Sequence, residues 1–414
     1  MKNNKICIIG LGYIGLPTAC LLANEGFKVL GVDINHSAVE KINLGISPIQ
    51  EPMLDENLFK AQEKKNFIAA TSAESADIFI ICVPTPFIRE ESKNTGSTPK
   101  PDLSFLYQAI DGLIPILKNG NSVILESTSP VGTTEELASY IFKKRVDLMR
   151  LNIGYCPERV LPGNIFHELI HNDRVVGGIN QESTNYLTEF YNSFVKGEVI
   201  ATNSKTAEMC KLSENSFRDT NIAFANSLSI LCDEKGIDVW ELISLANRHP
   251  RVNILNPGPG VGGHCIAVDP WFLVSGSSEG TELINQSRKI NDFKPLWAYR
   301  KVVEKIKIFS SESKIDPVVG CFGLTFKPDI DDIRESPAMQ IFNLLKNNGF
   351  KVKGIDPNLS SSTHSDLDLI SIAQAIDEVD IFVILVNHKD FMGDEFIKKI
   401  KRKNYLDFCG LVSI

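Results

Sequence analysis

The sequence predicts an α/β protein with two Rossmann-like, doubly wound domains joined by a long central helix. First, short apolar runs alternate with helical patterns from residue 5 onward, which is typical of a parallel sheet covered by helices. Second, roughly the last hundred residues repeat the same order of runs. Third, Thr202–Lys235 between these halves contains neither Pro nor Gly and therefore permits one long helix, ended by Gly236.

The N-terminal half supplies the first sheet. Its predicted strands are Lys5–Ile9, Phe27–Val32, Ile78–Val83 and Ser122–Leu125, and Leu16–Glu25 is the helix that joins the first two. Their apolar composition indicates strands buried on both faces.

A glycine-rich turn follows the first strand. Gly10, Gly12 and Gly15 have the spacing of a dinucleotide-binding turn: a tight turn, an open approach for the pyrophosphate, and close packing of helix on strand. Asp33 ends the second strand, where a carboxylate accepts hydrogen bonds from ribose hydroxyls and repels a 2′-phosphate. The alternative is a structural turn, but this combination predicts NAD as the cofactor.

The C-terminal half echoes these segments. Val318–Gly323 resembles the first strand, Gly349–Asp356 parallels Gly26–Asp33, and Val379–Ile384 parallels Ala76–Ile81. Because its glycine pattern is degraded, we expect no second dinucleotide site. The predicted domains are an NAD-binding domain at 1–200, a central helical and dimerisation region at 201–308, and a C-terminal α/β domain at 309–414.

Helix-like segments also cover Trp240–Asn247 and Glu282–Ile308, and Glu90–Pro101 has the polar composition of an exposed loop. Two further turns follow predicted strands, namely Val83–Pro86 and Glu126–Gly132. Both are expected at the carboxyl edge of the sheet, where ligands of such folds bind, although ordinary proline-rich turns are an equal alternative.

The segment Pro257–Pro270 is the most unusual. Four glycines precede Cys265 and allow a ligand to approach the backbone closely, and Asp269 stands one helical turn after the cysteine. A lone cysteine is usually an inert buried residue. The glycines and the nearby carboxylate favour a nucleophile instead.

Lys211, Asn215 and Arg218 lie at i, i+4 and i+7 of the long helix and span about 60° of its surface. A solvated face is the ordinary interpretation. The neighbouring positions are apolar, however, so this polar stripe is a candidate for stabilising an oxyanion.

Composition excludes several classes of protein. A net charge of −8 argues against a general nucleic-acid binder, and no apolar run approaches the length of a membrane span. Nine scattered cysteines without a Cys-x-x-Cys pair indicate a reduced, cytoplasmic chain. His167–His171 matches the H-E-x-x-H zinc pattern, but the segment that follows cuts its helix short and offers no third ligand, so we expect no metal.

Taken in order, these segments resemble the UDP-glucose/GDP-mannose dehydrogenase family over essentially the whole chain. The most specific stretches are Tyr155–Gly163, Thr206–Leu212, Asn247–Leu255, the Cys265 segment through Phe272, Phe326–Pro328 and Arg334–Pro337.

The resemblance implies two successive NAD-dependent oxidations at one site. Cys265 would attack the aldehyde formed first, and a thioester would then form and be hydrolysed. Lys211 and Asn215 would stabilise oxyanions, and Asp269 with Glu158 and Thr128 would handle protons near a water. The resemblance leaves open which carboxylate activates that water.

The resemblance also implies domain roles and ligand contacts. The region 201–308 would carry the catalytic cysteine, and the domain 309–414 would bind the UDP-sugar. The expected substrate contacts, besides Lys211 and Asn215, are Arg159, Val160, Arg218, His249, Arg251, Gly262 and Lys327. The expected cofactor contacts, besides Gly10, Gly12, Gly15 and Asp33, are Tyr13, Ile14, Thr85, Thr128 and Arg334. An arginine matching Arg251 can come from the neighbouring subunit in such enzymes, which implies a homodimer or a higher homo-oligomer. The implied substrate is UDP-N-acetyl-D-mannosamine, with UDP-N-acetyl-D-glucosamine as the alternative, and the product would feed a surface polysaccharide.

Overall fold

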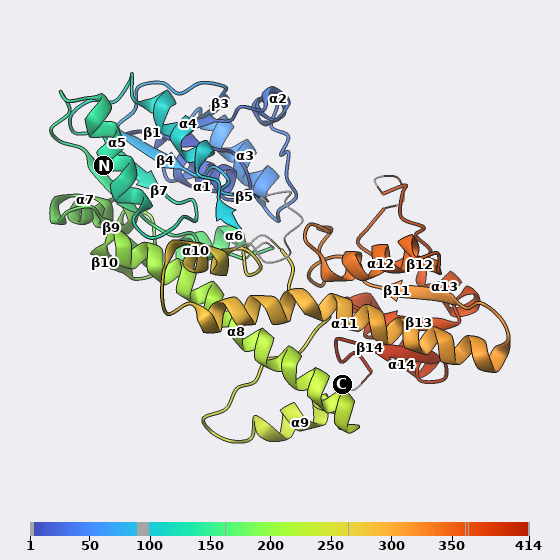
Figure 1. Cartoon of the computed structure of the whole chain (residues 1–414). Helices are drawn as coiled ribbons and strands as arrows, with labels where there is room; N and C mark the ends of the chain where they lie inside the picture. The colour runs from blue at the N-terminus through green and yellow to red at the C-terminus, as the bar shows by residue number, and fades with distance from the viewer. Residues whose placement is uncertain are drawn as a thin grey trace. The chain divides into compact units, whose positions relative to one another are not determined.

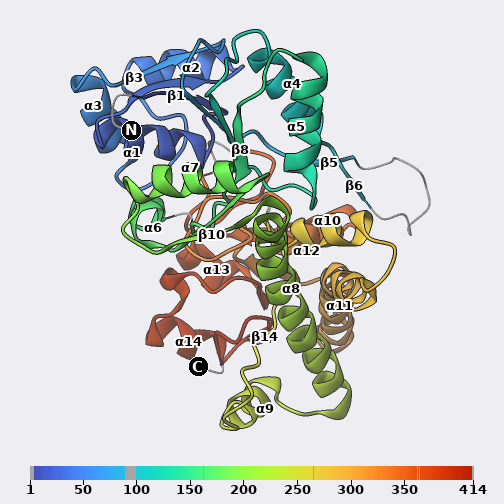
Figure 2. The same ribbon diagram turned by 90° about the vertical axis from the view of Figure 1, so that its left-hand side faces the viewer.

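The computed structural model describes residues 4–88, 99–161, 163–263, 265–360, 362 and 364–412. The chain divides into two compact units (Figures 1 and 2). The first comprises Met1–Ser213 with Trp271–Gly276, and the second comprises Glu214–Pro270 with Ser277–Ile414.

The first unit is built on one eight-stranded sheet within the described residues, in the order β10-β9-β8-β7-β4-β1-β2-β3. All neighbouring strands are parallel except β8 and β9. The strands are β1 (Lys5–Ile9), β2 (Lys28–Val32), β3 (Phe67–Ala70), β4 (Ile78–Ile81), β7 (Ser122–Leu125), β8 (Asn152–Tyr155), β9 (Arg174–Gly178) and β10 (Val199–Asn203).

Helices cover both faces of this sheet, so it is doubly wound (Figure 2). One core packs α1 (Gly15–Asn24), α2 (His36–Asn43), α3 (Leu54–Glu63), α6 (Ile165–His171) and α7 (Gln181–Asn192) against it. The opposite core contains α4 (Ser104–Leu113) and α5 (Thr133–Lys144). The predicted strands therefore form, although β4 ends two residues before the predicted Val83.

The expected loop at 90–101 is only partly tested, because 90–98 lie outside the described residues. Its end differs from the expectation: β6 (Lys100–Pro101) pairs antiparallel with β5 (Phe87–Ile88). A two-residue edge pairing has no apolar alternation that a sequence pattern could show.

The second unit contains a smaller, fully parallel sheet in the order β12-β11-β13-β14. Its strands are β11 (Val318–Phe322), β12 (Lys351–Ile355), β13 (Ile381–Ile384) and β14 (Asn404–Asp407). On one face pack α11 (Glu282–Ser313) and α12 (Pro337–Asn347), and on the other α13 (Ile372–Glu378) and α14 (Asp394–Ile400). This sheet confirms the predicted second doubly wound domain.

The long central helix is α8 (Ser204–Lys235), which begins in the first unit and continues into the second. It ends at Gly236, whose φ of +68° is the left-handed conformation expected there. The helix α9 (Val239–Ala246) follows, and α10 (Asp269–Gly276) begins just beyond Cys265. None of the helices in the described part of the chain combines the length and the apolar composition that a membrane crossing requires.

Within the second unit, α8 and α11 are joined by buried polar side chains rather than by apolar contacts alone. Asp219 accepts hydrogen bonds from Arg288 and, at 2.8 Å, from Asn291 Nδ2. Asn226 donates to Asn291 Oδ1 at 2.9 Å and accepts from the N–H of Gly258 at 2.9 Å. These buried hydrogen bonds therefore extend from α11 through α8 to the glycine-rich segment that leads to Cys265.

Candidate active site

The turn between β1 and α1 has the geometry of a phosphate-binding loop. Gly10 has a φ of +93°, and a Cβ on Gly15 would lie 1.8 Å from the carbonyl oxygen of Gly10. A Cβ on Gly12 would meet no atom within 4 Å, so the backbone there is open to a ligand. The N-terminus of α1 directly follows and provides backbone N–H groups for an anion.

Asp33 stands at the end of β2 beside this turn. Its Oδ2 accepts the N–H of Leu11 at 2.9 Å, and its Oδ1 accepts the N–H of Asn35 at 2.9 Å. The side chain is half-buried, so lone pairs remain accessible to ribose hydroxyls. These residues fit NAD, with Tyr13 and Ile14 partly exposed on the same turn.

The loops after β4 and β7 are tied together at the carboxyl edge of the sheet. Thr85 Oγ1 donates to the carbonyl oxygen of Thr128 at 2.6 Å, and Ser127 Oγ donates to that of Val83 at 2.7 Å. Both turns predicted at this edge therefore lie side by side.

Lys211 and Glu158 meet in the first unit. Lys211 Nζ donates to the main-chain carbonyl oxygen of Glu158 at 2.9 Å. The Glu158 carboxylate is itself fully engaged: Oε1 accepts the N–H groups of Arg159 and Val160, and Oε2 lies 2.5 Å from Arg174 Nη1. Burial works to lower the pKa of Arg174, but the charge of Glu158 together with that of the neighbouring acidic groups outweighs burial and raises it.

Cys265 differs from the other cysteines in its surroundings. It is exposed, and all nine cysteines lie in the described part of the chain and form no disulfide. Burial raises the pKa of Cys7, Cys20, Cys156 and Cys321 to about 12, which keeps those thiols protonated and unreactive. Exposure therefore favours Cys265 as the nucleophile.

Asp269 lies one turn after Cys265, as its spacing predicts. Its N–H donates to the carbonyl oxygen of Cys265 at 2.8 Å. The Asp269 side chain is buried, and Asn215 Nδ2 donates to its Oδ2 at 2.5 Å. The second unit thus places two predicted site residues, Asn215 and Asp269, in direct contact beside Cys265.

Gly262 and Gly263, just before Cys265, are required by close packing against the C-terminal domain. A Cβ on Gly262 would lie 2.5 Å from the carbonyl oxygen of Glu335, and one on Gly263 would lie 2.8 Å from the ring of Phe326. The Cys265 loop therefore rests on the segment that also carries Lys327 and Arg334. Lys327 is exposed, and Arg334 forms an ion pair with Asp332 at 2.6 Å.

The remaining residues predicted to contact the substrate are exposed or half-buried. Arg218 is exposed on α8, and His249 and Arg251 are exposed on a loop that Asn247 closes by pairing with both backbone groups of Ile254. Arg159 and Val160 are half-buried after β8, and Arg159 donates to the carbonyl oxygen of Asp173.

The H-E-x-x-H segment forms the short helix that was predicted. α6 has seven residues and ends at His171, whose ring stacks on His167 at a centroid distance of 4.2 Å. Glu168 accepts the N–H of Leu161 at 2.8 Å, so this carboxylate stabilises the loop that precedes α6.

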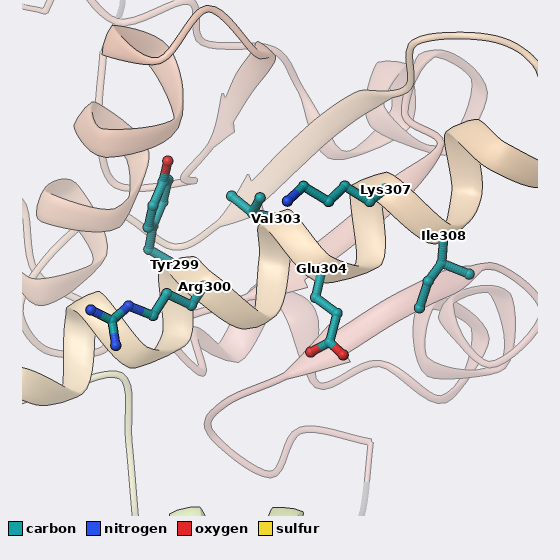
Figure 3. A pocket seen from close by; sticks show the side chains of 6 residues that line it. All are labelled: Tyr299, Arg300, Val303, Glu304, Lys307 and Ile308. Carbon is teal, nitrogen blue, oxygen red and sulfur yellow. The ribbon is translucent and has the colours of Figure 1, made fainter.

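A surface groove of about 380 Å³ lies along α11 and contains none of the predicted residues (Figure 3). It is lined by Tyr299, Arg300, Val303, Glu304, Lys307 and Ile308. Glu304 and Ile308 point to one side of the helix and Tyr299 to the other, so the groove follows a solvated helix surface (Figure 3).

Sequence reasoning missed Arg174, which orders the Glu158 segment. Its signal was a charge at the start of the apolar strand Arg174–Gly178, since a buried charge needs a partner. Asn226 gave no such signal, because its partners Asn291 and Gly258 come from distant parts of the sequence.

The chain matches three models of one family in succession. They are described as the NAD binding domain, the central domain and the UDP binding domain of the UDP-glucose/GDP-mannose dehydrogenase family, and they match residues 4–195, 205–293 and 320–413.

Individual relatives match over almost their full length. A UDP-N-acetyl-D-mannosamine dehydrogenase of Campylobacter jejuni is 47% identical, covering 98% of this chain and 99% of the relative. An NDP-N-acetyl-D-galactosaminuronic acid dehydrogenase of Ralstonia nicotianae is 46% identical, covering 93% and 91%. The solved UDP-D-ManNAc dehydrogenase of Pyrococcus horikoshii has a TM-score of 0.87 at 36% identity, covering 98% and 96%. The chain therefore belongs to the UDP-glucose/GDP-mannose dehydrogenase family and is an NAD-dependent nucleotide-sugar dehydrogenase.

Proposed function

We propose that this enzyme oxidises the C6 alcohol of UDP-N-acetyl-D-mannosamine to a carboxylate, giving UDP-N-acetyl-D-mannosaminuronate for surface polysaccharide synthesis. The substrate is supported by relatives of that name at 46–48% identity. The observation that carries the chemistry is an exposed Cys265 on a glycine-rich loop, one turn before a buried Asp269 that Asn215 holds.

The chemistry needs a covalent intermediate because an alcohol must lose four electrons without releasing the aldehyde. NAD, held by the Gly10–Gly15 turn and Asp33, would supply the hydride acceptor for each of the two oxidations at C6. After the first, the Cys265 thiolate attacks the aldehyde carbon, and the new S–C bond leaves a negative charge on oxygen. Lys211 and Asn215 lie one turn apart on α8 and would donate to that oxygen.

The second oxidation turns this thiohemiacetal into a thioester. Water then adds to the carbonyl carbon and the S–C bond breaks, which releases the carboxylate and regenerates the thiol. One water is consumed and two NAD are reduced per sugar. Asp269, with Glu158 and Thr128, would surround that water.

We propose Asp269 rather than Glu158 as the proton acceptor. Glu158 is committed to structural contacts, because Oε1 accepts the N–H groups of Arg159 and Val160 and Oε2 is paired with Arg174. Glu158 and Thr128 would then position the water and the Lys211 ammonium.

The proposed ligand contacts are those that the resemblance implied. For the nucleotide sugar they are Arg159, Val160, Arg218, His249, Arg251, Gly262 and Lys327. For NAD they are the Gly10–Gly15 turn with Tyr13 and Ile14, Asp33, Thr85, Thr128 and Arg334.

The alternative substrate is UDP-N-acetyl-D-glucosamine, and the Ralstonia relative adds a galacto-configured candidate. Epimers differ at one stereocentre, so direct comparison decides. We expect the purified enzyme with NAD to produce two NADH per UDP-N-acetyl-D-mannosamine, measured at 340 nm. A higher kcat/KM for UDP-N-acetyl-D-glucosamine or for the galacto-configured sugar would replace the proposed substrate.

Cys265→Ser tests the covalent step. We expect this variant to bind NAD as the wild type does and to form no uronate, whereas Cys210→Ser, at a half-buried cysteine, should retain turnover. Uronate formation by Cys265→Ser at the wild-type rate would refute the mechanism.

A homodimer is part of the proposal. Phe217, Phe224 and Leu231 recur every seven residues on α8 and are 69%, 55% and 53% exposed. Residues at this spacing share one helix face, so they form an apolar stripe suited to a second copy of the chain.

All nine cysteines remain outside disulfides, and we propose that the enzyme works in the reducing cytoplasm.

A further inference from the structure

The C-terminal sheet repeats the cofactor turn of the N-terminal sheet in atomic detail. Gly323 has a φ of +82°, and its N–H donates to the carbonyl oxygen of Ile355 at 2.8 Å. Gly10 does the same with Val32, also at 2.8 Å. The β11–β12 pair therefore retains the tight turn of a dinucleotide-binding fold.

The acidic residue of that turn is retained as well. Asp356 follows β12 as Asp33 follows β2. Its Oδ2 accepts the N–H of Leu324 at 2.7 Å, and its Oδ1 accepts that of Asn358 at 2.9 Å. These bonds reproduce those of Asp33 with Leu11 and Asn35.

The two carboxylates differ in what lies above them. Asp33 is half-buried, whereas the side chains of Asp356 and His388 are both completely buried. His388 Nε2 lies 3.1 Å from Asp356 Oδ2. His388 stands four residues after β13, as Thr85 stands four residues after β4, and its ring contacts Asp356 from that position.

The backbone fixes the tautomer of His388. The N–H of Asp329 can only donate, and it points at Nδ1 at 3.0 Å, with Asn358 Nδ2 at 2.8 Å from the same atom. Nδ1 must therefore accept, and Nε2 carries the hydrogen that Asp356 receives. Burial works to raise the pKa of Asp356, but the hydrogen bonds from His388 and the Leu324 N–H outweigh it and lower the pKa.

This network holds the segment 324–329 at both ends. Asp356 accepts from Leu324 and Thr325, and His388 accepts from Asp329, whose φ is +61°. A non-glycine residue rarely adopts this left-handed conformation, so the bond to His388 helps to hold the turn at Asp329. Thr325 Oγ1 donates to the carbonyl oxygen of Lys327 at 2.9 Å and fixes the middle of the segment.

Two side chains connect residues 324–329 to the proposed site. Lys327 is exposed at its centre, and the ring of Phe326 packs on Gly263, two residues before Cys265. We propose that His388 is a positioning residue: it closes the vestigial dinucleotide turn and makes Asp356 the anchor of the turn that presents Lys327 to the nucleotide sugar. This inference rests on the proposed function, because it takes Lys327 as a substrate contact.

The test compares full-length His388→Phe and His388→Asn by calorimetric titration with UDP and, separately, with NAD. Phe fills the volume and loses the hydrogen bonds with Asp356, Asp329 and Asn358, whereas Asn keeps an acceptor near the Asp329 N–H. We expect UDP affinity to fall about tenfold or more in His388→Phe and less in His388→Asn, because all of these buried hydrogen bonds are lost in the first. NAD affinity should stay at the wild-type value in both. His364→Phe makes the same chemical change at a half-buried histidine and should leave both affinities unchanged.

The outcomes are distinguishable. A folded His388→Phe that binds UDP within twofold of the wild type, or that loses UDP and NAD affinity alike, overturns the positioning role. If His388→Phe does not fold, Thr325→Val decides, since it removes the bond from Thr325 Oγ1 to the Lys327 carbonyl and the 3.4 Å contact of the same hydroxyl with His388 Nε2. Unchanged UDP affinity in that variant overturns the role too. A wild type that binds no UDP contradicts the proposed function instead.

Discussion

The ion pair between Arg174 and Glu158 offers a direct test of how the Glu158 segment, whose main-chain carbonyl holds Lys211, is ordered. The two side chains are 4% and 6% exposed and lie 2.5 Å apart. Arg174→Met keeps most of the aliphatic stem and removes the positive charge. The Glu158 carboxylate then stays buried with only its two backbone donors, Arg159 and Val160.

The expected loss follows from that uncompensated charge. Removing one partner of a buried pair costs about 3–5 kcal/mol, and the two remaining N–H bonds offset a part, so we expect about 3 kcal/mol. The double variant Glu158→Gln with Arg174→Met removes both charges and should be more stable than Arg174→Met alone. Because the Glu158 carbonyl holds Lys211 Nζ, kcat should fall together with stability.

Urea unfolding followed by circular dichroism measures the stability of the single and double variants, which completes a double-mutant cycle. Lys60→Met breaks an ion pair with Glu56 whose side chains are 53% and 58% exposed, and it should match the wild type. If Arg174→Met lost less than about 1 kcal/mol, or if the two single effects simply added, the buried pair could not be what orders this segment.

Three further predictions concern the cofactor turn, a buried lysine and the apolar stripe. Gly15→Ala should weaken NAD binding at least about tenfold in calorimetry, because its Cβ meets the Gly10 carbonyl at 1.8 Å, whereas Gly112→Ala, with no atom within 4 Å, should not. Burial lowers the pKa of Lys294 from 10.5 to about 7, so the unfolded chain binds more protons between these values and stability rises with pH there. Lys294→Met should abolish that rise and add as much as about 4 kcal/mol near pH 7, and equal urea midpoints for wild type and variant at both pH 7 and pH 10 would contradict it. Phe224→Lys should yield monomers in sedimentation velocity; an unchanged dimer would place the interface elsewhere.

Local chemistry explains what could be predicted. The strand Lys5–Ile9, the Gly10–Gly15 turn and Asp33 form one contiguous signal, because glycine and apolar runs act on the backbone nearest them. α8 follows equally from an uninterrupted helical composition. The proximity of Asp269 to Cys265 could be predicted because a spacing of four residues corresponds to about one helical turn.

Tertiary structure decided which polar groups are neutralised and which remain available. Glu158 and Arg174 are 16 residues apart, and Asp356 and His388 are 32 apart, with no spacing rule that pairs them. The exposure of Cys265 likewise distinguishes it from the buried, unreactive thiols, a difference that residue type alone does not show. The sequence by itself determined the two wound domains, the cofactor turn and the nucleophile's setting. Only the folded chain decided that Asp33 stays half-buried while Asp356 is closed, because the His388 ring that covers Asp356 follows β13 and lies 32 residues away in sequence.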